Sequence, residues 1–320
     1  MENISKIRKK NICISCEGCK AICPVSAIEI EYKNGKYVPY VDEKSCIECG
    51  KCLKICYGNH IETNGIDIGE YIEVYDAYVP HEKLRKRSTS GGVISRLLTA
   101  LIQDNKVDGA FVLNFDPSIN KPARLAFVKD KESVYEASSS KYIPGSVFNI
   151  LGKIEEEGTY AIVGTPCQFY TIKNYIEEKC LESNILYLGL FCDRTMNFNF
   201  IKYMEDKFGK NRENLINIDY RNKEKRGWPG DIKLYFDSGR EVIVDRKKRT
   251  EVKDYFMLER CLYCTDKLNR HADISFGDCY IHGKEYPERT SVIVRTPKGK
   301  EVFERYSNLF VVNESSLKSV

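Results

Sequence analysis

Several features that define large classes of protein are missing from this sequence. No apolar run approaches the roughly 18 residues that a membrane-spanning helix needs, so we expect no direct membrane insertion. No signal peptide opens the chain, and we therefore expect a cytoplasmic protein. The formal net charge of +4 over 320 residues is too small to favour nucleic acid as a partner.

Two common phosphate-binding motifs are missing as well. No GxGxxG follows a predicted strand, so a Rossmann site for NAD is not indicated, and no GxxxxGK followed by Ser or Thr occurs. Histidine is scarce, and its spacing does not suggest metal binding, so we assign no role to His60, His81, His271 or His282. The basic run at residues 246–249 is interpreted as a solvated face.

Cysteine, in contrast, is abundant. The chain has 14 cysteines, which in a short secreted protein would indicate a disulfide scaffold. Eight of them lie in two runs with the spacing C-x2-C-x2-C-x3-C, which is typical of a bacterial ferredoxin with two [4Fe-4S] clusters. The runs are Cys13, Cys16, Cys19 and Cys23, followed by Cys46, Cys49, Cys52 and Cys56.

The ferredoxin spacing also predicts which cysteines share a cluster. Three closely spaced thiolates bind one cube, and the fourth crosses to the other cube. We therefore expect one cluster on Cys13, Cys16, Cys19 and Cys56, and the other on Cys46, Cys49, Cys52 and Cys23. Disulfides or two zinc sites are the alternatives, but zinc favours C-x2-C pairs separated by a longer stretch. The second run ends in Tyr57 where the first has Pro24, and this difference leaves cluster binding unaffected.

Two domains are predicted, a ferredoxin-type domain over residues 1–65 and a larger domain over 71–320. The first begins with a basic, mobile lead-in over residues 1–10. Between its cysteine runs, strands 27–32 and 36–41 form a hairpin around Asn34-Gly35. Residues 61–70 read as a linker, after which strand and helix signals alternate. The predicted fold class is α+β, a small ferredoxin-like domain followed by a larger mixed α/β domain.

The larger domain contains the other six cysteines. Cys167 follows a predicted buried strand, Cys192 ends another, and Cys261 and Cys264 form a C-x2-C pair. Because strand ends of an α/β sheet converge on one edge, these four could bind a third cube. A structural zinc site and ordinary core packing remain open alternatives. For Cys180 and Cys279 we favour small core residues.

Two polar stretches are candidate cofactor sites. Residues 88–92 read Ser-Thr-Ser-Gly-Gly at the start of a predicted helix, where small residues and free N–H groups would suit a phosphate. A Ser-capped helix is the ordinary alternative. Residues 138–146 are polar, with Lys141 and Tyr142 among them, and could supply the donors and aromatic neighbour that a flavin needs. A surface loop is the alternative there.

From residue 71 onward the chain resembles the beta subunit of coenzyme F420 hydrogenases and dehydrogenases, and the ferredoxin domain in front resembles longer members of that family. Each motif is weak alone, but seven occur in the family's order. They are Ser90-Gly91-Gly92-Val93, Ser140-Lys141-Tyr142, Gly164-Thr165-Pro166-Cys167-Gln168, Gly189-Leu190-Phe191-Cys192, Tyr220-Arg221 with Gly227-Trp228-Pro229-Gly230, Cys261-Leu262-Tyr263-Cys264, and Ala272-Asp273-Ile274-Ser275-Phe276-Gly277-Asp278.

The resemblance implies that the larger domain binds FAD and a [4Fe-4S] cluster. By position, the third cluster's ligands would be Cys167, Cys192, Cys261 and Cys264. Lys141 is the candidate catalytic residue, because a positioned cation would stabilise negative charge on reduced flavin. The implied FAD contacts are Ser90, Gly91, Gly92, Ser140, Lys141, Tyr142, Gly164 and Thr165.

The predicted function is that of an iron–sulfur flavoprotein oxidoreductase. It would pass electrons between hydride chemistry at FAD, with coenzyme F420 or a similar small redox substrate, and the [4Fe-4S] clusters. The alternatives are a ferredoxin-dependent reductase of another substrate and a non-catalytic electron-transfer subunit of a larger complex. We expect a hydrogenase, dehydrogenase or ferredoxin as the protein partner. Fold and cofactors transfer well within such a family, whereas the substrate transfers poorly.

Overall fold

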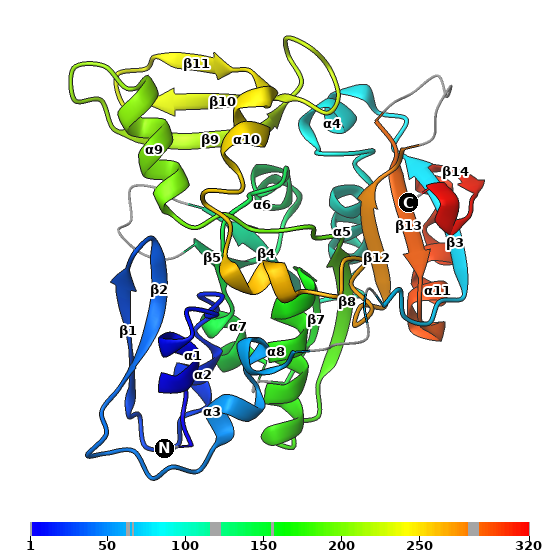
Figure 1. Cartoon of the computed structure of the whole chain (residues 1–320). Coiled ribbons are helices and arrows are strands. Elements are labelled where there is room, and N and C mark those ends of the chain that lie inside the picture. The colour runs from blue at the N-terminus through cyan, green and yellow to red at the C-terminus, as the bar shows by residue number, and fades with distance from the viewer. Residues whose placement is uncertain are drawn as a thin grey trace.

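The computed structural model describes residues 2–61, 65, 67–115, 123–154, 157–280 and 288–319 (Figure 1). The ferredoxin-like region comes first and lies at the lower left of Figure 1. Its elements are α1 (Ser5–Lys9), α2 (Gly18–Ile22), β1 (Ile28–Lys33), β2 (Lys36–Val41), α3 (Lys51–Lys54) and η1 (Tyr57–Asn59). The predicted linker lies partly outside the described residues, at 62–64 and 66.

The predicted hairpin of the ferredoxin-like region is confirmed. Strands β1 and β2 are antiparallel, and Lys33 lies opposite Lys36 across a two-residue turn. Both turn residues have positive φ angles, 52° at Asn34 and 75° at Gly35. Turns of this kind match the twist of the paired strands, and asparagine and glycine adopt them at little cost.

The prediction of a mobile lead-in is wrong. Residues 5–9 form α1, and Ile4 and Ile7 on either side of its first turn are only 1% and 2% exposed. Both belong to the core that surrounds the first cysteine run. The basic residues, which dominate the composition of this segment, lie on the outer side. The segment is therefore a short amphipathic helix, and its many charges led to the wrong prediction.

A nine-stranded sheet forms the larger domain, in the order β14-β3-β13-β12-β8-β7-β4-β5-β6. Strands β4, β7, β8 and β12 are parallel neighbours, so their carboxyl ends share one edge. The strands are β3 (Glu73–Tyr78), β4 (Gly109–Asn114), β5 (Ala123–Val128), β6 (Gly145–Ser146), β7 (Thr159–Gly164), β8 (Asn184–Leu190), β12 (Ile274–Asp278), β13 (Thr290–Val294) and β14 (Val311–Glu314).

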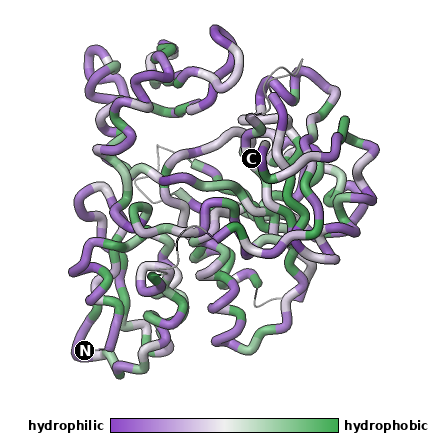
Figure 2. Tube along the Cα trace, turned by 45° about the vertical axis from the view of Figure 1, so that its right-hand side comes forward, coloured by the Kyte–Doolittle hydropathy of each residue, from purple (hydrophilic) through white to green (hydrophobic). Residues whose placement is uncertain are grey.

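Helices cover both faces of this sheet, because its central strands are apolar on both sides. In β8, Leu186 and Leu188 pack on one face, while Ile185 and Tyr187 pack on the other. Figure 2 shows the hydrophobic residues gathered along these strands. The first face is covered by α4 (Glu82–Arg87), α5 (Val93–Gln103), α6 (Lys131–Glu136) and α11 (Pro297–Arg305), and the second by α7 (Phe148–Lys153) and α8 (Pro166–Glu178).

The ferredoxin-like region packs outside α7 and α8 and shares their hydrophobic core. A separate three-stranded sheet with its own core lies above it in Figure 1. That sheet consists of β9 (Leu215–Asn222), β10 (Asp231–Phe236) and β11 (Glu241–Val244), with α9 (Asn199–Phe208) against it. The remaining elements are α10 (Arg246–Val252), η2 (Glu259–Tyr263), η3 (Ser307–Leu309) and η4 (Leu317–Ser319).

The predicted fold class is confirmed, since a small ferredoxin-like region precedes a larger mixed-sheet domain. The sequence patterns did not predict β5 or the helices α4 and α6, and six residues are too few for a helical period to show in α4 and α6. Within the described residues, no helix is long and apolar enough to cross a membrane.

Candidate cluster and cofactor site

The eight cysteines of the two runs gather in two sets of four. One cavity is lined by Cys13, Cys16, Cys19 and Cys56, and a second by Cys23, Cys46, Cys49 and Cys52. The last cysteine of each run therefore joins the cavity of the other run, as the crossing rule predicts. The rest of each lining is mostly apolar, with isoleucines such as Ile14 and Ile28.

Backbone geometry around the first run suits iron–sulfur binding. Ser15 and Glu17 have left-handed φ angles of 58° and 61°, which wrap the chain tightly between the cysteines. The Ser15 N–H donates to the sulfur of Cys13 at 3.4 Å, and the Ala27 N–H donates to that of Cys23 at 3.3 Å. Such N–H donors stabilise the negative charge of a thiolate-bound cluster.

The structure also brings together four cysteines of the larger domain. Cys167 lies in the first turn of α8, Cys192 follows β8, and Cys261 and Cys264 lie in and just after η2. Burial raises the pKa of Cys167 to about 12, with further contributions from Cys261 and Cys264. Burial also raises the pKa of Cys192, and Cys167, Cys261 and Cys264 add to that rise. The four thiols therefore lie close enough to influence one another electrostatically.

The arrangement of the four thiols is not that of a site for a single metal ion. Within the described ranges, no group of three or more His, Cys, Asp or Glu side chains is arranged to hold one metal ion. A [4Fe-4S] cube makes a different demand, because its four thiolates bind four separate irons. The donor set in this place is chemically suited to a cube, since all four side chains are thiols, each of them partly buried.

The last two cysteines lie in contrasting places. Cys279 is buried directly after β12, as expected of a small core residue. Cys180 is exposed, so the expectation that it packs in the core is wrong. It comes after the end of α8 with a left-handed φ of 52°, and the chain turns outward there.

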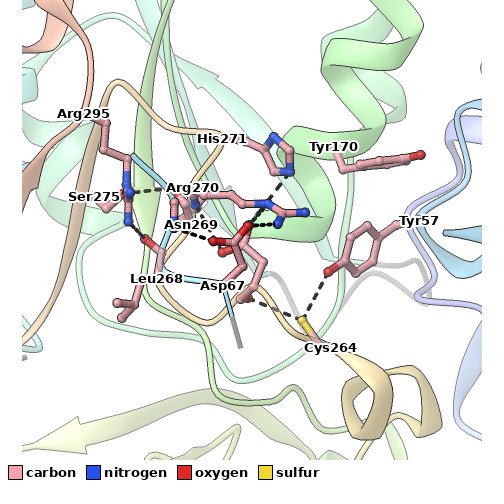
Figure 3. Close-up of polar contacts among 12 residues, drawn as sticks. Tyr57, Asp67, Tyr170, Cys264, Leu268, Asn269, Arg270, His271, Ser275 and Arg295 are labelled. Atoms are coloured by element: carbon pink, nitrogen blue, oxygen red, sulfur yellow. Dashed lines mark hydrogen bonds and ion pairs between the residues drawn. The ribbon is translucent and has the colours of Figure 1, made fainter. Parts of the chain in front are cut away.

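Helix α8 connects the first cysteine cavity to the four thiols of the larger domain. The hydroxyl of Thr171 lies 3.9 Å from the sulfur of Cys16 and donates to the Cys167 carbonyl at 3.1 Å. Gly18 packs so closely on this helix that an added Cβ would lie 2.5 Å from the Thr171 methyl group. A second connection is visible in Figure 3, where the hydroxyl of Tyr57 points at the sulfur of Cys264, 3.3 Å away.

The Ser-Thr-Ser-Gly-Gly stretch does precede α5, but packing within the protein is enough to require glycine at position 91. Its N–H donates to Thr290 Oγ1 at 2.9 Å, and its carbonyl accepts from the Val79 N–H at 2.9 Å. An added Cβ would lie 2.6 Å from the Ala77 carbonyl oxygen. Gly92 caps the helix with a φ of 82°. Close packing on β3 therefore explains Gly91 without a phosphate, and the free N–H groups of α5 begin after Gly92.

The ammonium group of Lys141 is bound to backbone carbonyls and does not point freely at a ligand site. Its ammonium donates to the carbonyls of Ala137, Ser138 and Ser139 at the end of α6. Burial lowers its pKa to about 8, and the neighbouring Asp219 partly opposes this effect. The cation therefore stabilises the loop that carries Ser140 and Tyr142.

Contacts between side chains bring the candidate flavin segments together. The Ser140 N–H donates to Thr89 Oγ1 at 2.7 Å, so the loop after α6 touches the segment before α5. The hydroxyl of Ser90 is hydrogen-bonded to the carboxylate of Asp278, at the end of β12. Gly164 and Thr165 lie on the same sheet edge, next to the thiols. Thr165 Oγ1 is 3.3 Å from the sulfur of Cys167, and the Gly164 carbonyl accepts from Asn269 at 2.9 Å.

Two cations at this edge were not predicted as site residues. Arg221, which is buried, donates to the Tyr142 hydroxyl at 2.9 Å and pairs with Asp278 at 3.0 Å. Lys223 donates to the carbonyls of Arg85 and Ser90, at 3.1 and 3.4 Å. Both come from β9 and the loop after it, far in sequence from α5. The Tyr-Arg motif was the available signal for Arg221, whereas nothing in the sequence pointed to Lys223.

Arg249 corrects the interpretation of the basic run as a solvated face. Its guanidinium lies 5.1 Å from the centre of the Tyr142 ring and donates to the Tyr220 carbonyl at 2.6 Å. Burial lowers its pKa. Together with Arg221 and Lys223 it makes this edge cationic and rich in donors, which suits an anionic cofactor such as a dinucleotide.

Comparison with known proteins identifies the family. Residues 74–152 and 158–319 match the N-terminal and C-terminal descriptions of the coenzyme F420 hydrogenase/dehydrogenase beta subunit. The chain belongs to this family. In front of the family's two regions, residues 12–59 match a 4Fe-4S dicluster domain, which identifies the ferredoxin-like region as an iron–sulfur domain.

Relatives of this family member cover nearly all of the chain. The coenzyme F420-dependent sulfite reductase of Methanocaldococcus jannaschii is 26% identical over 317 residues, 93% of this chain but only 46% of that protein. The chain thus spans about half of this relative's length. One of the subunits of the F(420)H(2) dehydrogenase of Methanosarcina mazei is 23% identical over 319 residues, 94% of this chain and 84% of the relative.

A solved structure has the same fold. A chain of the F420-reducing [NiFe] hydrogenase complex from Methanosarcina barkeri superposes with a TM-score of 0.57 at 16% identity. The match covers 80% of this chain and 85% of the other. At that identity the likeness concerns the fold alone.

Proposed function

We propose that this chain is an iron–sulfur flavoprotein that passes electrons between a two-electron carrier and three [4Fe-4S] clusters. The carrier would be coenzyme F420 or a small redox substrate of similar chemistry, and FAD would be the first cofactor. Bound FAD would supply the exchange between a hydride and single electrons. The protein's own residues would bind the cofactors, exclude water and hold them in sequence.

The observation that carries this proposal is that three sets of four cysteines follow one another in space. Thr171 of α8 lies beside Cys16 of the first cavity, and Cys167 is one helical turn earlier on the same helix. The second cavity shares the small ferredoxin-like region with the first. A continuous path of this kind is useful only if electrons enter at one end and leave at the other.

The cationic edge described above supports FAD binding next to the third thiol group. Helix α5 is 11 residues long and has free N–H groups at its start, and the Lys223 ammonium donates to the Ser90 carbonyl just before it, which adds positive charge near that helix end. Arg221 positions Tyr142 and Asp278 in the same region. Gly164 and Thr165 would then lie between the flavin and Cys167, since they belong to the strand end that precedes α8.

The second cavity offers the outer end of the path. Cys49 is exposed, and so is its neighbour Ile47, with 61% of its surface accessible. A protein partner such as a hydrogenase, dehydrogenase or ferredoxin would exchange electrons here. The relatives named as subunits support such a partner, and the sulfite reductase shows how a longer chain can include the same unit.

The proposal is tested on the whole chain, purified without oxygen. We expect about twelve irons per chain, four for each cube, and one FAD released on denaturation. Reduced coenzyme F420 should then bleach the flavin and reduce the clusters, and a viologen dye should accept the electrons.

Each alternative has its own result. Cofactors without turnover of any soluble two-electron carrier would favour a non-catalytic electron-transfer subunit. Turnover of another substrate with reduced ferredoxin, but not with coenzyme F420, would favour the ferredoxin-dependent reductase. A chain that binds no flavin, or no more than about eight irons, contradicts the proposal.

A further inference from the structure

Tyr57 lies between the ferredoxin-like region and the larger domain. It directly follows Cys56, a candidate ligand of the first cluster, and the residue is only 4% exposed. Its hydroxyl reaches the sulfur of Cys264, a candidate ligand of the third cluster, at 3.3 Å (Figure 3). One residue therefore connects the two cysteine groups.

The direction of this hydrogen bond follows from cluster chemistry. A cysteine that binds iron is a thiolate, which has no proton to donate. The Tyr57 hydroxyl must then donate, and the sulfur of Cys264 must accept. Hydrogen bonds to cluster sulfurs favour the more negative, reduced state and so raise the reduction potential.

Arg260 holds Tyr57 in this position. Its guanidinium lies 4.3 Å from the centre of the Tyr57 ring, and its Nε donates to the Tyr57 carbonyl at 3.1 Å. A second nitrogen donates to the carbonyl of His60. Arg260 also directly precedes Cys261, so the residue that holds Tyr57 is a chain neighbour of a candidate ligand of the third cluster.

The charge of Arg260 has no counterion in the part of the chain that the structure describes. The side chain is 2% exposed, no carboxylate pairs with it there, and its Nη1 is buried without a hydrogen-bond partner among those residues. A buried cation of this kind is costly unless something negative compensates it. A cube with four thiolate ligands carries net negative charge, and would supply both the compensation and an acceptor.

We propose that Tyr57 and Arg260 form a tuning pair that raises the reduction potential of the cluster held by Cys167, Cys192, Cys261 and Cys264. The proposal rests on the proposed function, because it requires that third cluster. Tyr57 acts through the hydrogen bond to Cys264, and Arg260 acts through its charge and by fixing the tyrosine ring. Both are positioning residues, and neither touches the two-electron substrate.

The test is a redox titration of the whole, cluster-loaded chain, followed by electron paramagnetic resonance. The signal of the third cluster is assigned as the one lost when Cys261 and Cys264 are both replaced by serine. Tyr57→Phe removes only the hydroxyl. The hydrogen bond to the thiolate strengthens when the cluster gains an electron, so its loss should lower the equilibrium constant for reduction of this cluster about fivefold. At 59 mV per tenfold change, that is about 40 mV.

Matched variants separate tuning from packing. Tyr170→Phe removes a hydroxyl from the neighbouring ring, 5.3 Å away, whose hydroxyl points away from Cys264 in Figure 3. It should leave the midpoint unchanged. Arg260→Gln should lower the midpoint further than Tyr57→Phe, and Arg260→Lys should restore most of the loss, since it keeps the charge.

Failure of this inference and failure of the proposed function give different results. If the unmodified chain has only about eight irons, the third cluster is absent and the proposed function fails. If about twelve irons are present but Tyr57→Phe titrates like the unmodified chain, the third cluster exists and the tuning pair does not. Because Tyr57→Phe preserves the buried ring, this second result is accessible even if the Arg260 variants do not fold.

Discussion

Arg221 and Asp278 form a largely buried ion pair, 3.0 Å long, between the end of β9 in the small sheet and the carboxyl end of β12. Through its other nitrogens Arg221 contacts Tyr142 and the carbonyl of Pro229, while Asp278 accepts from Ser90. One guanidinium thus ties together four segments that are separated in sequence. We infer that this pair sets the shape of the cationic edge at which FAD is proposed to bind.

Replacing Arg221 with glutamine should weaken flavin binding about tenfold or more, because the Asp278 carboxylate would lose its cationic partner near an anionic cofactor. We also expect about 3 kcal/mol less stability. Flavin affinity and thermal unfolding are measured together. Arg226→Gln is the matched control, because Arg226 pairs with two aspartates yet is 43% exposed at its side chain. Unchanged flavin affinity in Arg221→Gln would remove this residue from the site.

Flavin affinity should decrease as the pH rises through about 8. Burial lowers the pKa of Lys223 to about 8, so the side chain is charged below that pH and neutral above it. The Ser90 carbonyl, to which it donates, does not titrate. Below pH 8 the ammonium attracts the cofactor's phosphates. Lys223→Met should reduce the affinity at pH 7 and flatten the profile. Lys141, with a pKa of about 8, contributes in the same direction and is tested in parallel.

Lys141→Ala is expected to cost stability as well as to alter the flavin. Removing the ammonium leaves the carbonyls of Ala137, Ser138 and Ser139 without this donor, which costs about 1 to 3 kcal/mol. Unfolding temperature and flavin midpoint potential should both be measured. A lower flavin potential at unchanged stability supports the catalytic role. Lower stability with an unchanged potential limits Lys141 to supporting the loop.

Replacing both Cys261 and Cys264 with serine should remove about four irons and preserve the signals of the two ferredoxin clusters. Cys180→Ser is the control, because Cys180 is exposed and lies beyond the end of α8. Cys279→Ser should likewise leave the iron content intact. Iron analysis gives the iron content of each variant, and electron paramagnetic resonance gives the signals of its clusters. Iron loss in Cys180→Ser to the same extent as in Cys167→Ser would falsify the proposed ligand set.

Gly18→Ala should loosen the contact between the ferredoxin-like region and α8, at a cost of about 1 to 3 kcal/mol. The new methyl would lie 2.5 Å from the Thr171 methyl group. Adding Thr171→Ser removes that methyl and keeps the hydroxyl, so the double variant should recover stability. Electron transfer from flavin to the ferredoxin clusters, monitored by stopped-flow absorbance, should slow in Gly18→Ala and recover in the double variant. Additive effects of the two substitutions would show that the contact is unimportant.

Gly91→Val is a poorer probe of the flavin site than the sequence suggests. From the motif alone, valine at this position should block phosphate and leave the fold intact. The structure places the new Cβ against the Ala77 carbonyl, so the fold itself would be disturbed. Loss of flavin in that variant would not distinguish a phosphate site from a packed glycine.

Sequence alone was sufficient for the features that depend on local spacing. The cysteine runs predicted which cysteines gather around each of the two cavities, because the spacing of three ligands and a crossing fourth is a local property of a dicluster domain. The Asn34-Gly35 turn and the apolar strands were predicted for the same reason, since turn chemistry and strand period are properties of adjacent residues. The domain boundaries and the site residues of the larger domain remain predictions.

Contacts between distant segments required the tertiary structure. The sequence showed that Tyr57 stands where the first run has proline, but its role depends on Cys264, 207 residues later. Arg221 and Lys223 likewise acquire meaning only when β9 and its loop lie beside α5 and β12. Charge misled in both directions: it concealed α1, and it suggested a solvated face for Arg249. Local patterns determine how each segment folds, whereas burial and the partners of a buried charge are decided only when the segments pack together.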